Sequence, residues 1–503
     1  MPLPSGRMPS LADHTNQLPL FHVVGFSGHR QLANPAGVAQ VIQDTLVALS
    51  QKSTGEWVAL SSVAVGGDQV FVRQVLALGV SWHAILPLPR LDFAADFSAT
   101  DWPAVENLLG AAEHVRVITE NGTREDAYLD CGMETVNGCD VLLAVWDGQP
   151  ARGKGGTADV VKYATALGKP VIIIDAATLA VRSETPTLFQ KPDAALAALN
   201  QLPPATTGWS ENPFKAPDRI FAFQHKCDYA ASHGAPQFRR LIVSTVLLHV
   251  VATLVAAAGL AFELHIVALP WVKLMCLVGA LGVALLLRSQ HHHHSWVRCR
   301  LAAEFCRSAL ATWGLPRAAP FFEDLDLPGV HALTRALHIL HSRSANTQPV
   351  PMEEFKRIYL EKRIDDQLAY YRRQENRAVP LHRRLKVGFW ITTLSALVCT
   401  AAYAVCETWN IGVPDWVETA VFYFLPISLP VVAASFISFI SINDLQRRVA
   451  RYREMHAMLT ASHQQVEFCQ TWNSLERIVL KTERALLQEV LEWHSITSFA
   501  ESH

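Results

Sequence analysis

The sequence predicts an α/β domain with a mostly parallel sheet, followed by an all-α membrane module of four spans. Two observations predict this division. Residues 19–176 alternate short apolar runs with stretches long enough for helices, which is typical of parallel strands joined by helical crossovers. The second half holds four apolar runs of 20 residues or more. Only 17% of the 503 residues are charged, below the roughly 25% usual in soluble domains.

The composition excludes several function classes. A formal net charge of −2 gives the chain no general attraction to nucleic acid. The nine cysteines form no CxxC pair, and three of them, Cys276, Cys399 and Cys406, lie in apolar runs, so neither a disulfide framework nor a zinc finger is indicated. Residues 1–18 are polar and are expected to be flexible. They contain no apolar stretch of the signal-peptide type, so export is not expected.

Six short apolar runs are the expected strands of the α/β domain. They are Phe21–Val24, Val58–Val65, His83–Pro87, Val115–Thr119, Val141–Trp146 and Val171–Ile174. Ligands of such sheets bind outside the carboxyl ends of the strands. The glycines of this domain follow the predicted strand ends, which places a binding site there.

Four membrane spans are expected. At about 1.5 Å per residue, each run is long enough as a helix to cross the ~30 Å hydrocarbon core. Lys273 lies near the outer end of its run, where a long side chain reaches the interface. Pro426 and Pro430 interrupt the last run, which bilayers tolerate where neighbouring helices satisfy the backbone. The spans are residues 241–262, 267–287, 387–406 and 419–442.

Basic residues flank the spans on one side only, which predicts that both termini face the cytoplasm. The connections within each pair of spans carry acidic residues instead, Glu263 in the first and Glu407, Asp415 and Glu418 in the second. The basic flanks are Arg239 and Arg240, then Arg288, Arg298 and Arg300, then Arg383, Arg384 and Lys386, and finally Arg447, Arg448 and Arg451.

The two helical hairpins suggest a duplication. Residues 236–241 (PQFRRL) before the first span match residues 380–385 (PLHRRL) before the third. Prolines and glycine break the periodicity between the α/β domain and the membrane module. The expected organisation is a linker at 177–219, a first hairpin unit at 220–320, a connector at 321–350 and a second hairpin unit at 351–503.

Four segments at predicted strand ends form a candidate anion cradle. Glycines let backbone N–H groups approach a phosphate, and a helix beginning near Thr157 adds its free donors and its dipole. Arg30 and Lys154 offer positive charge, while Asp68 and Asp147 offer acceptors for a ribose hydroxyl or a base amine. The candidate ligand-binding residues are Gly25, Ser27, Gly28, His29, Arg30, Gly66, Gly67, Asp68, Pro87, Asp147, Gly148, Lys154, Gly155, Gly156, Thr157 and Asp159.

Residues 19–176 resemble the SLOG superfamily, a Rossmann-like fold that includes LOG nucleotide phosphoribohydrolases and sensors of nucleotide signals in bacterial defence. The resemblance rests on residues 25–30 (GFSGHR), 66–68 (GGD), 140–148 (DVLLAVWDG) and 153–159 (GKGGTAD). It implies a nucleotide-derived ligand, a second messenger made by a separate enzyme, and no cofactor.

The membrane half resembles the SLATT class of membrane effectors, in which a transmembrane hairpin is flanked by cytosolic helices. The second unit carries the resemblance in residues 359–371 (YLEKRIDDQLAYY) and 484–493 (RALLQEVLEW). The first unit is a more degenerate copy. The two resemblances together imply a multi-pass protein of the bacterial inner membrane.

One departure separates the chain from the LOG hydrolases. Their Pro-Gly-Gly-x-Gly-Thr-x-x-Glu loop supplies a glutamate that acts on the glycosidic bond. Aligning Gly156 and Thr157 with that loop places Val160 at the glutamate position, with Asp159 one residue early. Without that carboxylate, general acid–base catalysis is not expected, and no catalytic residue is assigned.

The leading hypothesis is a homo-oligomeric effector that senses the nucleotide through the SLOG-like domain and permeabilises the membrane, in antiphage defence. Two alternatives remain open. One is a membrane-anchored nucleotide-processing enzyme of the N-glycosidase or phosphoribohydrolase type, with Asp159 or Asp68 as its acid–base group. The other is a scaffold that tethers SLOG-like domains. His291–His294 follow a membrane exit and are interpreted as a solvated interfacial run, not a metal site.

Overall fold

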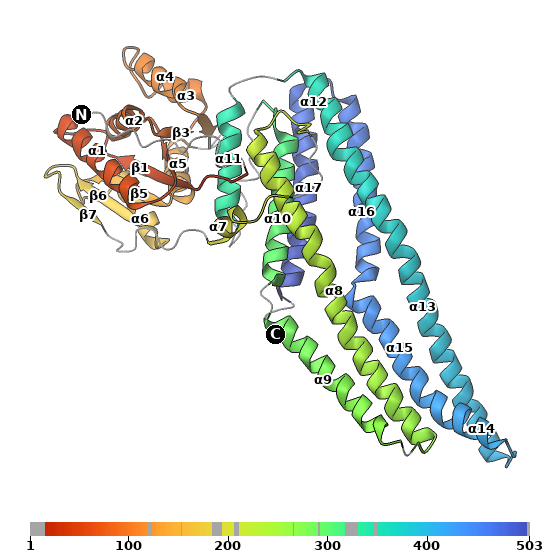
Figure 1. The fold of residues 1–503 in the computed structure, drawn as a ribbon. Helices are drawn as coiled ribbons and strands as arrows, with labels where there is room; N and C mark the ends of the chain where they lie inside the picture. Colours follow the sequence, from red (N-terminus) through yellow and green to blue (C-terminus); the bar gives the residue numbers. More distant parts are fainter. Residues whose placement is uncertain are drawn as a thin grey trace. The chain divides into compact units, whose positions relative to one another are not determined.

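The computed structural model describes residues 16–118, 123–151, 153–183, 194–205, 211–264, 266–289, 292–316, 330–345 and 350–499 (Figure 1). The chain forms two compact units. The first comprises Met1–Leu202, Lys215–Phe223 and Thr312–Val350, and the second comprises Pro203–Phe214, Gln224–Ala311 and Pro351–His503. The expected flexible N-terminus lies mostly outside the described residues, as do parts of the expected linker and connector.

The first unit is built on a seven-stranded sheet with the order β4-β3-β2-β1-β5-β6-β7. All neighbouring strands pair in parallel except β6 and β7, which are antiparallel. The predicted α/β class is therefore confirmed. The strands are β1 (Phe21–Gly28), β2 (Glu56–Ser61), β3 (Ser81–Leu86), β4 (His114–Val117), β5 (Val141–Trp146), β6 (Val171–Asp175) and β7 (Val181–Ser183).

Helices cover both faces of the sheet. Because crossovers between parallel strands are right-handed, α1 and α2 pack on one face and α5 and α6 on the other. Asn34 caps α1 by accepting a 2.9 Å hydrogen bond from Gly37 N, and Pro35 occupies the first helical turn. These helices are α1 (Pro35–Lys52), α2 (Gly67–Ala77), α3 (Arg90–Ala94), α4 (Trp102–Gly110), α5 (Arg124–Gly138), α6 (Thr157–Ala166) and α7 (Ala194–Asn200).

The expected strand ends need two corrections. The first strand does not stop at Val24 but continues to Gly28, so Gly25 and Gly28 lie inside β1 and not in a turn after it. A Cβ at Gly25 would lie 2.8 Å from Cys139 Cβ, so this glycine permits close packing within the sheet layer. The second strand ends at Ser61 rather than at Val65. The short, exposed strand β7 was not predicted at all.

A helix also lies within the expected connector. α11 (His331–Ala345) belongs to the sheet-containing unit. Its Arg335 forms a 2.5 Å ion pair with Asp140, and its Arg343 forms a 2.8 Å ion pair with Glu56. The segment that joins the two hairpin units is thus attached to the α/β domain.

The second unit is helical, and the four predicted spans are confirmed as helices long and apolar enough to cross a membrane. They are residues 241–261, residues 268–286 and the apolar parts of the long helical stretches 352–408 and 415–468. The elements are α8 (Asp218–Ala261), α9 (Ala268–Ser289), α10 (His292–Thr312), α12 (Met352–Tyr359), the π-helical turn η2 (Leu360–Ile364), α13 (Asp365–Thr408), α14 (Asp415–Val417), η3 (Glu418–Phe424, also π-helical), α15 (Leu425–Ile442), α16 (Leu445–Phe468) and α17 (Trp472–Phe499).

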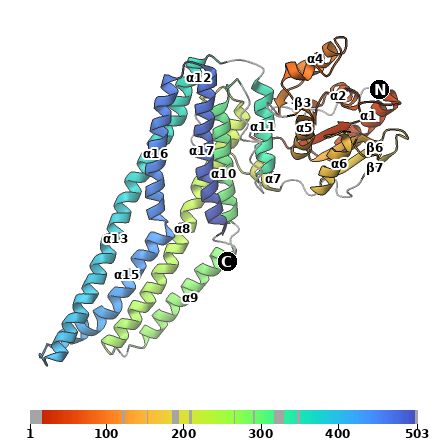
Figure 2. The ribbon, with the colours of Figure 1, turned by 180° about the vertical axis from the view of Figure 1, so that it is seen from behind.

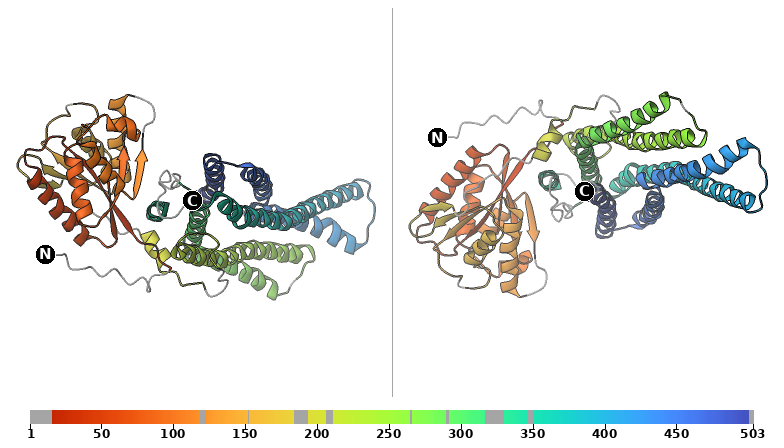
Figure 3. Two further views of the ribbon diagram at one scale, coloured as in Figure 1. Left: turned by 90° about the horizontal axis from the view of Figure 1, so that it is seen from above. Right: turned by 90° about the horizontal axis from the view of Figure 1, so that it is seen from below.

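The spans pack as hairpins. α13 and α15 lie side by side, and a Cβ at Gly388 of α13 would meet the Phe436 ring of α15 at 2.9 Å (Figure 2). α8 and α9 lie alongside each other, with Leu248 3.5 Å from the position of a Cβ at Gly279 (Figure 3). The Phe262 and Phe424 rings, 5.5 Å apart, join the first hairpin to the second. The small residues let the helix backbones approach closely, as membrane helices require.

Candidate functional site

The candidate site lies where the strand order reverses. β1 continues the chain toward β2 on one side of the sheet, whereas β5 continues it toward β6 on the other. The carboxyl ends of these two neighbouring strands therefore form the switch point of the sheet, which is where open α/β sheets bind ligands. Ser27 and Gly28 of β1 pair with Ala144 and Val145 of β5, so the segments that follow both strands emerge together.

Glycines bring the end of β1 against the beginning of α2. Gly67 N donates a 2.9 Å hydrogen bond to His29 O. A Cβ at Gly66 would lie 2.3 Å from Arg30 O, and its φ of +96° is one that other residues rarely adopt. A Cβ at Gly28 would lie 3.1 Å from Gly67 Cα. The predicted glycines at 28, 66 and 67 therefore lie in contact with one another, and α2 begins beside the end of β1.

Asp68 lies in the first turn of α2 with only 6% of its surface exposed. Burial raises the pKa of its carboxyl to about 7, although the Ser62 hydroxyl and the backbone N–H groups of Gly28 and Ala64 stabilise the charged form. The Ser62 hydroxyl donates to this carboxylate. Asp68 thus ties the turn after β2 to the end of β1, with its carboxyl facing the protein interior.

The segment after β5 lies beside the segment after β1. His29 Nε2 lies 3.0 Å from the Asp147 carboxylate and 3.0 Å from Asp147 N. Without a hydrogen on Nε2 the imidazole accepts from that N–H, and with a hydrogen on Nε2 it donates to the carboxylate. The N–H of Gln149 and then His29 lower the pKa of Asp147. Gly148, with a φ of +78°, allows the turn that follows.

The glycine loop before α6 is held by its own residues. Asp159 accepts a 3.1 Å hydrogen bond from Gly155 N. Gly155 has a φ of +80°, and a Cβ there would lie 2.6 Å from Leu129 N, so the loop packs tightly on α5. Gly156 precedes the first turn of α6, and the Ser27 hydroxyl lies 3.5 Å from the Thr157 hydroxyl. The N-terminus of α6 therefore reaches the carboxyl end of β1.

The two cationic candidates have different surroundings. Lys154 pairs with Asp126 of α5, and both side chains are exposed. The exposed Arg30 guanidinium lies 5.2 Å from the centre of the Tyr128 ring, in cation–π geometry. The Tyr128 hydroxyl donates to Asp96. Arg30 is thus held over an aromatic ring while its side chain remains exposed.

Most of the sequence-predicted residues are therefore gathered at one end of the sheet. Pro87 is buried just after β3. The sequence analysis missed Asp96, Asp126 and Tyr128, which lie on or beside helices far from the glycine segments in the chain. No motif marks them, because their role depends on how α5 packs beside α6.

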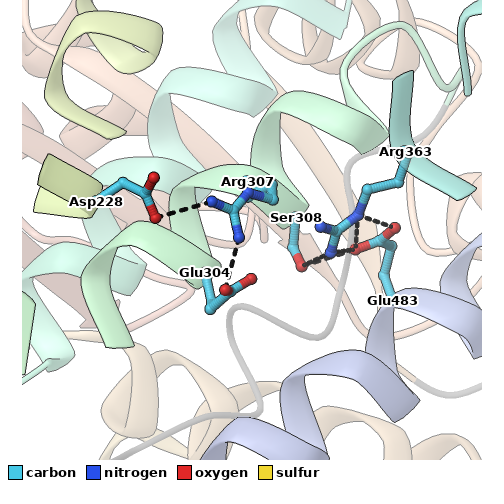
Figure 4. A network of polar contacts seen from close by, with 6 residues as sticks. All are labelled: Asp228, Glu304, Arg307, Ser308, Arg363 and Glu483. Atoms are coloured by element: carbon cyan, nitrogen blue, oxygen red, sulfur yellow. Dashed lines mark hydrogen bonds and ion pairs between the residues drawn. The ribbon is translucent and has the colours of Figure 1, made fainter. Parts of the chain in front are cut away.

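A second polar cluster lies in the membrane-module unit, and we call it the polar network (Figure 4). Its centre is an ion pair between Arg363 of η2 and Glu483 of α17, 2.6 Å apart and at most 1% exposed. The Ser308 hydroxyl of α10 and the Tyr359 hydroxyl donate to the same carboxylate, at 2.7 and 3.0 Å. Its members drawn in Figure 4 are Asp228, Glu304, Arg307, Ser308, Arg363 and Glu483.

The network joins the two hairpin units. Arg307 of α10 bonds Asp228 of α8 at 3.0 Å and Glu304 at 2.6 Å. Burial raises the pKa of Glu304, but the charges of Arg307 and Arg363 outweigh burial and hold that pKa below its usual value. The sequence holds one sign of this network, the position of Glu483 on its helix. Glu483 falls at a core position between Val479 and Leu486, where an apolar residue is expected.

The substitution Glu483→Gln is predicted to destabilise the helical unit by about 3–5 kcal/mol, because it leaves Arg363 as an uncompensated buried charge. The matched control is Glu361→Gln, which breaks the exposed pair with Arg357 and is expected to cost less than about 0.5 kcal/mol. Thermal melting of the detergent-solubilised full chain, followed by circular dichroism, measures both. Equal melting midpoints for the two variants would contradict this role.

Two family models match the helical part of the chain. Residues 222–358 match the model described as "SMODS and SLOG-associating 2TM effector domain 3". Residues 359–493 match "SMODS and SLOG-associating 2TM effector domain 1". Comparison with curated proteins gives no match. The first match ends at Ile358 and the second begins at Tyr359, whose hydroxyl bonds Glu483 of the buried ion pair. The membrane half of this chain is therefore a tandem of two domains similar to the SLATT class of two-span effector domains.

Proposed function

We propose that this protein is an effector of the bacterial inner membrane that binds a nucleotide-derived second messenger and, on binding it, permeabilises the membrane. The observation that carries the proposal is the combination of two parts in one chain. The glycine segments proposed as an anion cradle lie at the strand-order reversal of the α/β domain, and two domains similar to membrane effectors follow it. The SLOG resemblance of residues 19–176 supports the nucleotide class of the ligand and the defence role.

In this proposal the cradle binds phosphate groups. The N-termini of α2 and α6 supply backbone N–H donors and the favourable end of the helix dipole. Arg30 supplies a guanidinium that forms two hydrogen bonds to one phosphate, and Ser27 and Thr157 supply hydroxyls. The chemistry fits an ADP-ribose derivative or a cyclic oligonucleotide.

The proposal assigns no catalysis to the cradle. Val160 is 2% exposed and packs on Gly132 of α5. Asp159, the nearest carboxylate to the position of the hydrolase glutamate, accepts a hydrogen bond from the loop that it follows. If the purified protein hydrolysed ADP-ribose or a cyclic oligonucleotide, that result would support the membrane-anchored enzyme instead.

Self-association is the proposed route from binding to permeabilisation. A ligand shifts the membrane module only if it binds two states of the protein with different affinities. Two spans per hairpin are too few to line a wide pore in one chain, whereas a ring of subunits presents polar groups to water. The candidate lining groups are Ser244, Thr245, His249, Ser435, Ser438 and Ser441. Thr245, Ser435 and Ser438 donate to carbonyls of their own helices, which gives these hydroxyls a partner inside the apolar span.

The first test is ligand binding by the cradle. Gly156→Val is expected to abolish binding of ADP-ribose or a cyclic oligonucleotide, because the added side chain occupies the space that the phosphate needs beside α6. Arg30→Ala is expected to weaken binding by about 1.5–3 kcal/mol through loss of a charge-assisted hydrogen bond. Isothermal titration calorimetry of the full chain in detergent measures both changes.

Arg73→Ala is the matched control for Arg30→Ala, since Arg73 is an exposed arginine of α2 in the same domain. It is expected to leave the affinity unchanged. Gly156→Val is expected to remain folded, because the φ of −71° at Gly156 suits valine. Melting curves of the variant check this. Wild-type affinity in a folded Gly156→Val protein would remove this loop from the site.

A second test concerns topology. Reporters fused after Pro19 and after His503 are expected to be cytoplasmic, and one inserted near Pro414 periplasmic, because the basic flanks lie on the side of both termini. Paired alkaline phosphatase and green fluorescent protein fusions distinguish the two sides. A cytoplasmic signal at Pro414 would contradict four full spans.

The third test is permeabilisation. Saturating ligand is expected to enlarge or rearrange the oligomer and to release dye from liposomes that contain the protein. Gly156→Val is expected to abolish dye release, whereas His249→Leu is expected to keep ligand binding and change conductance alone. Native mass spectrometry and dye release measured on the same samples test this. If bound ligand changes neither, the membrane half is an anchor and the scaffold hypothesis holds.

A further inference from the structure

α11, the helix between the two membrane hairpins and within the first family match, is seated across the amino-terminal edge of the sheet, opposite the cradle. Its Arg343 bonds Glu56 at the start of β2 at 2.8 Å, Ser81 at the start of β3 at 2.9 Å, and Glu113 just before β4 at 3.1 Å. The same guanidinium lies 4.9 Å from the centre of the Phe21 ring at the start of β1. One side chain thus contacts four neighbouring strand beginnings.

Arg335 secures the other half of the helix. It bonds Asp140, just before β5, at 2.5 Å, and the same carboxylate accepts a 2.8 Å hydrogen bond from Val23 N of β1. Arg335 also lies 3.2 Å from His331, one helical turn earlier. The seat of α11 therefore combines buried apolar side chains, among them Leu333, Leu337 and Ile339, with charged hydrogen bonds to the sheet edge, which depend on the local balance of charge.

Histidines fill the space between α11 and this edge. The ring of His338 lies 6.3 Å from that of His83 in β3 and 5.7 Å from that of His114 in β4, and the two strand rings are 5.8 Å apart. His341 of α11 stacks on Trp313 at 4.9 Å and is 1% exposed. Among the described residues, no three His, Cys, Asp or Glu side chains are arranged to hold a metal ion. We call His83, His114, His338 and His341 the histidine cluster.

The charges around the histidine cluster limit how many protons it accepts. Among the described residues, the carboxylates are Glu56, Glu113 and Asp140, and the guanidiniums are Arg335 and Arg343, while His331 faces Arg335. With neutral imidazoles the set has one negative charge in excess. Glu113 Oε2 lies 3.5 Å from His83 Nε2 and favours one proton there. Each further proton adds a cation beside the arginines that hold the helix.

We propose that α11 is a latch that holds the connection between the two hairpin units to the α/β domain, and that protonation of the histidine cluster loosens it. Loosening frees the connector, and the membrane helices can then rearrange. This last consequence rests on the proposed function. Acidification of the cytoplasm, as follows when a membrane becomes permeable to protons, then acts in the same direction as the nucleotide.

The direction of the pH effect follows from His341. Burial, together with the charges of His338 and His114, lowers its pKa to about 3 in the seated state. In a released helix the pKa returns to about 6.5. Between these values the released state binds more protons, so seating is strongest above pH 6.5 and weakens as the pH falls. Through His341, the ratio of seated to released helix drops by about tenfold per pH unit below pH 6.5.

Hydrogen exchange of the full chain in nanodiscs tests the latch without any ligand. After correction for intrinsic exchange rates, protection of the α11 amides is expected to fall about tenfold or more between pH 7.5 and pH 5.5, while α5 serves as the internal reference. Arg343→Gln is expected to reduce α11 protection at both pH values. His341→Gln is expected to flatten the pH dependence, and His114→Gln, at a half-buried site that tolerates change, serves if His341→Gln does not fold.

The matched control is His463→Gln, which removes a histidine of α16 paired with Asp365 and is expected to keep the wild-type pH dependence. Unchanged α11 protection between pH 7.5 and 5.5, or a wild-type slope in a folded cluster variant, would overturn the latch. Dye release at pH 5.5 is measured in parallel. If acid loosens α11 while ligand releases no dye at either pH, the latch stands and the proposed permeabilisation fails.

Discussion

The buried ion pair between Arg363 and Glu483 is the interaction on which the helical half of this protein depends. Neither charge reaches water, so each is stable only while the other remains beside it. Ser308 reaches the same carboxylate from the first hairpin unit, so the helices of both units must meet at one point. Helices from two effector-like domains that follow one another in sequence are thereby packed into one folded body outside the apolar spans. A purely apolar interface would tolerate slippage that these directional hydrogen bonds do not.

The α/β domain divides its contacts between the two edges of one sheet. The carboxyl edge carries the glycine segments and two helix N-termini, whereas the amino edge carries the ion pairs of Arg335 and Arg343 with α11. The same strands run from one edge to the other. In the proposed function the sheet is therefore the element that relates ligand binding to the connector of the membrane module, and neither edge alone explains the coupling.

What the sequence could predict follows from which constraints are local. Spans follow from length and apolarity, because lipid offers no partner for the backbone, so all four were found. The glycines at 66, 67 and 148 were assigned to strand ends because tight turns favour glycine. Gly25 was placed in a turn because the neighbour that requires a glycine there, Cys139, is distant in sequence. Tyr128 and the Arg363–Glu483 pair were missed because the contacts that define them, with Arg30 and with each other, join residues more than 90 positions apart. Contacts of this kind have no signature within a short window of sequence.

The π-helical turn at Leu360–Ile364 has a consequence for how the second effector-like domain tolerates change in length. A π turn holds one residue more than an α turn over the same rise. Losing a single residue there would restore a regular α turn and leave the segments on either side in nearly the same relative orientation. Losing one from the α-helical part of α13 would instead rotate everything before it by about 100°, so that Tyr359, whose hydroxyl bonds Glu483, would face away from its partner. The π turn is therefore the place in this long helix where the chain can change by one residue while the buried charges keep their orientation relative to the part that continues into the bilayer.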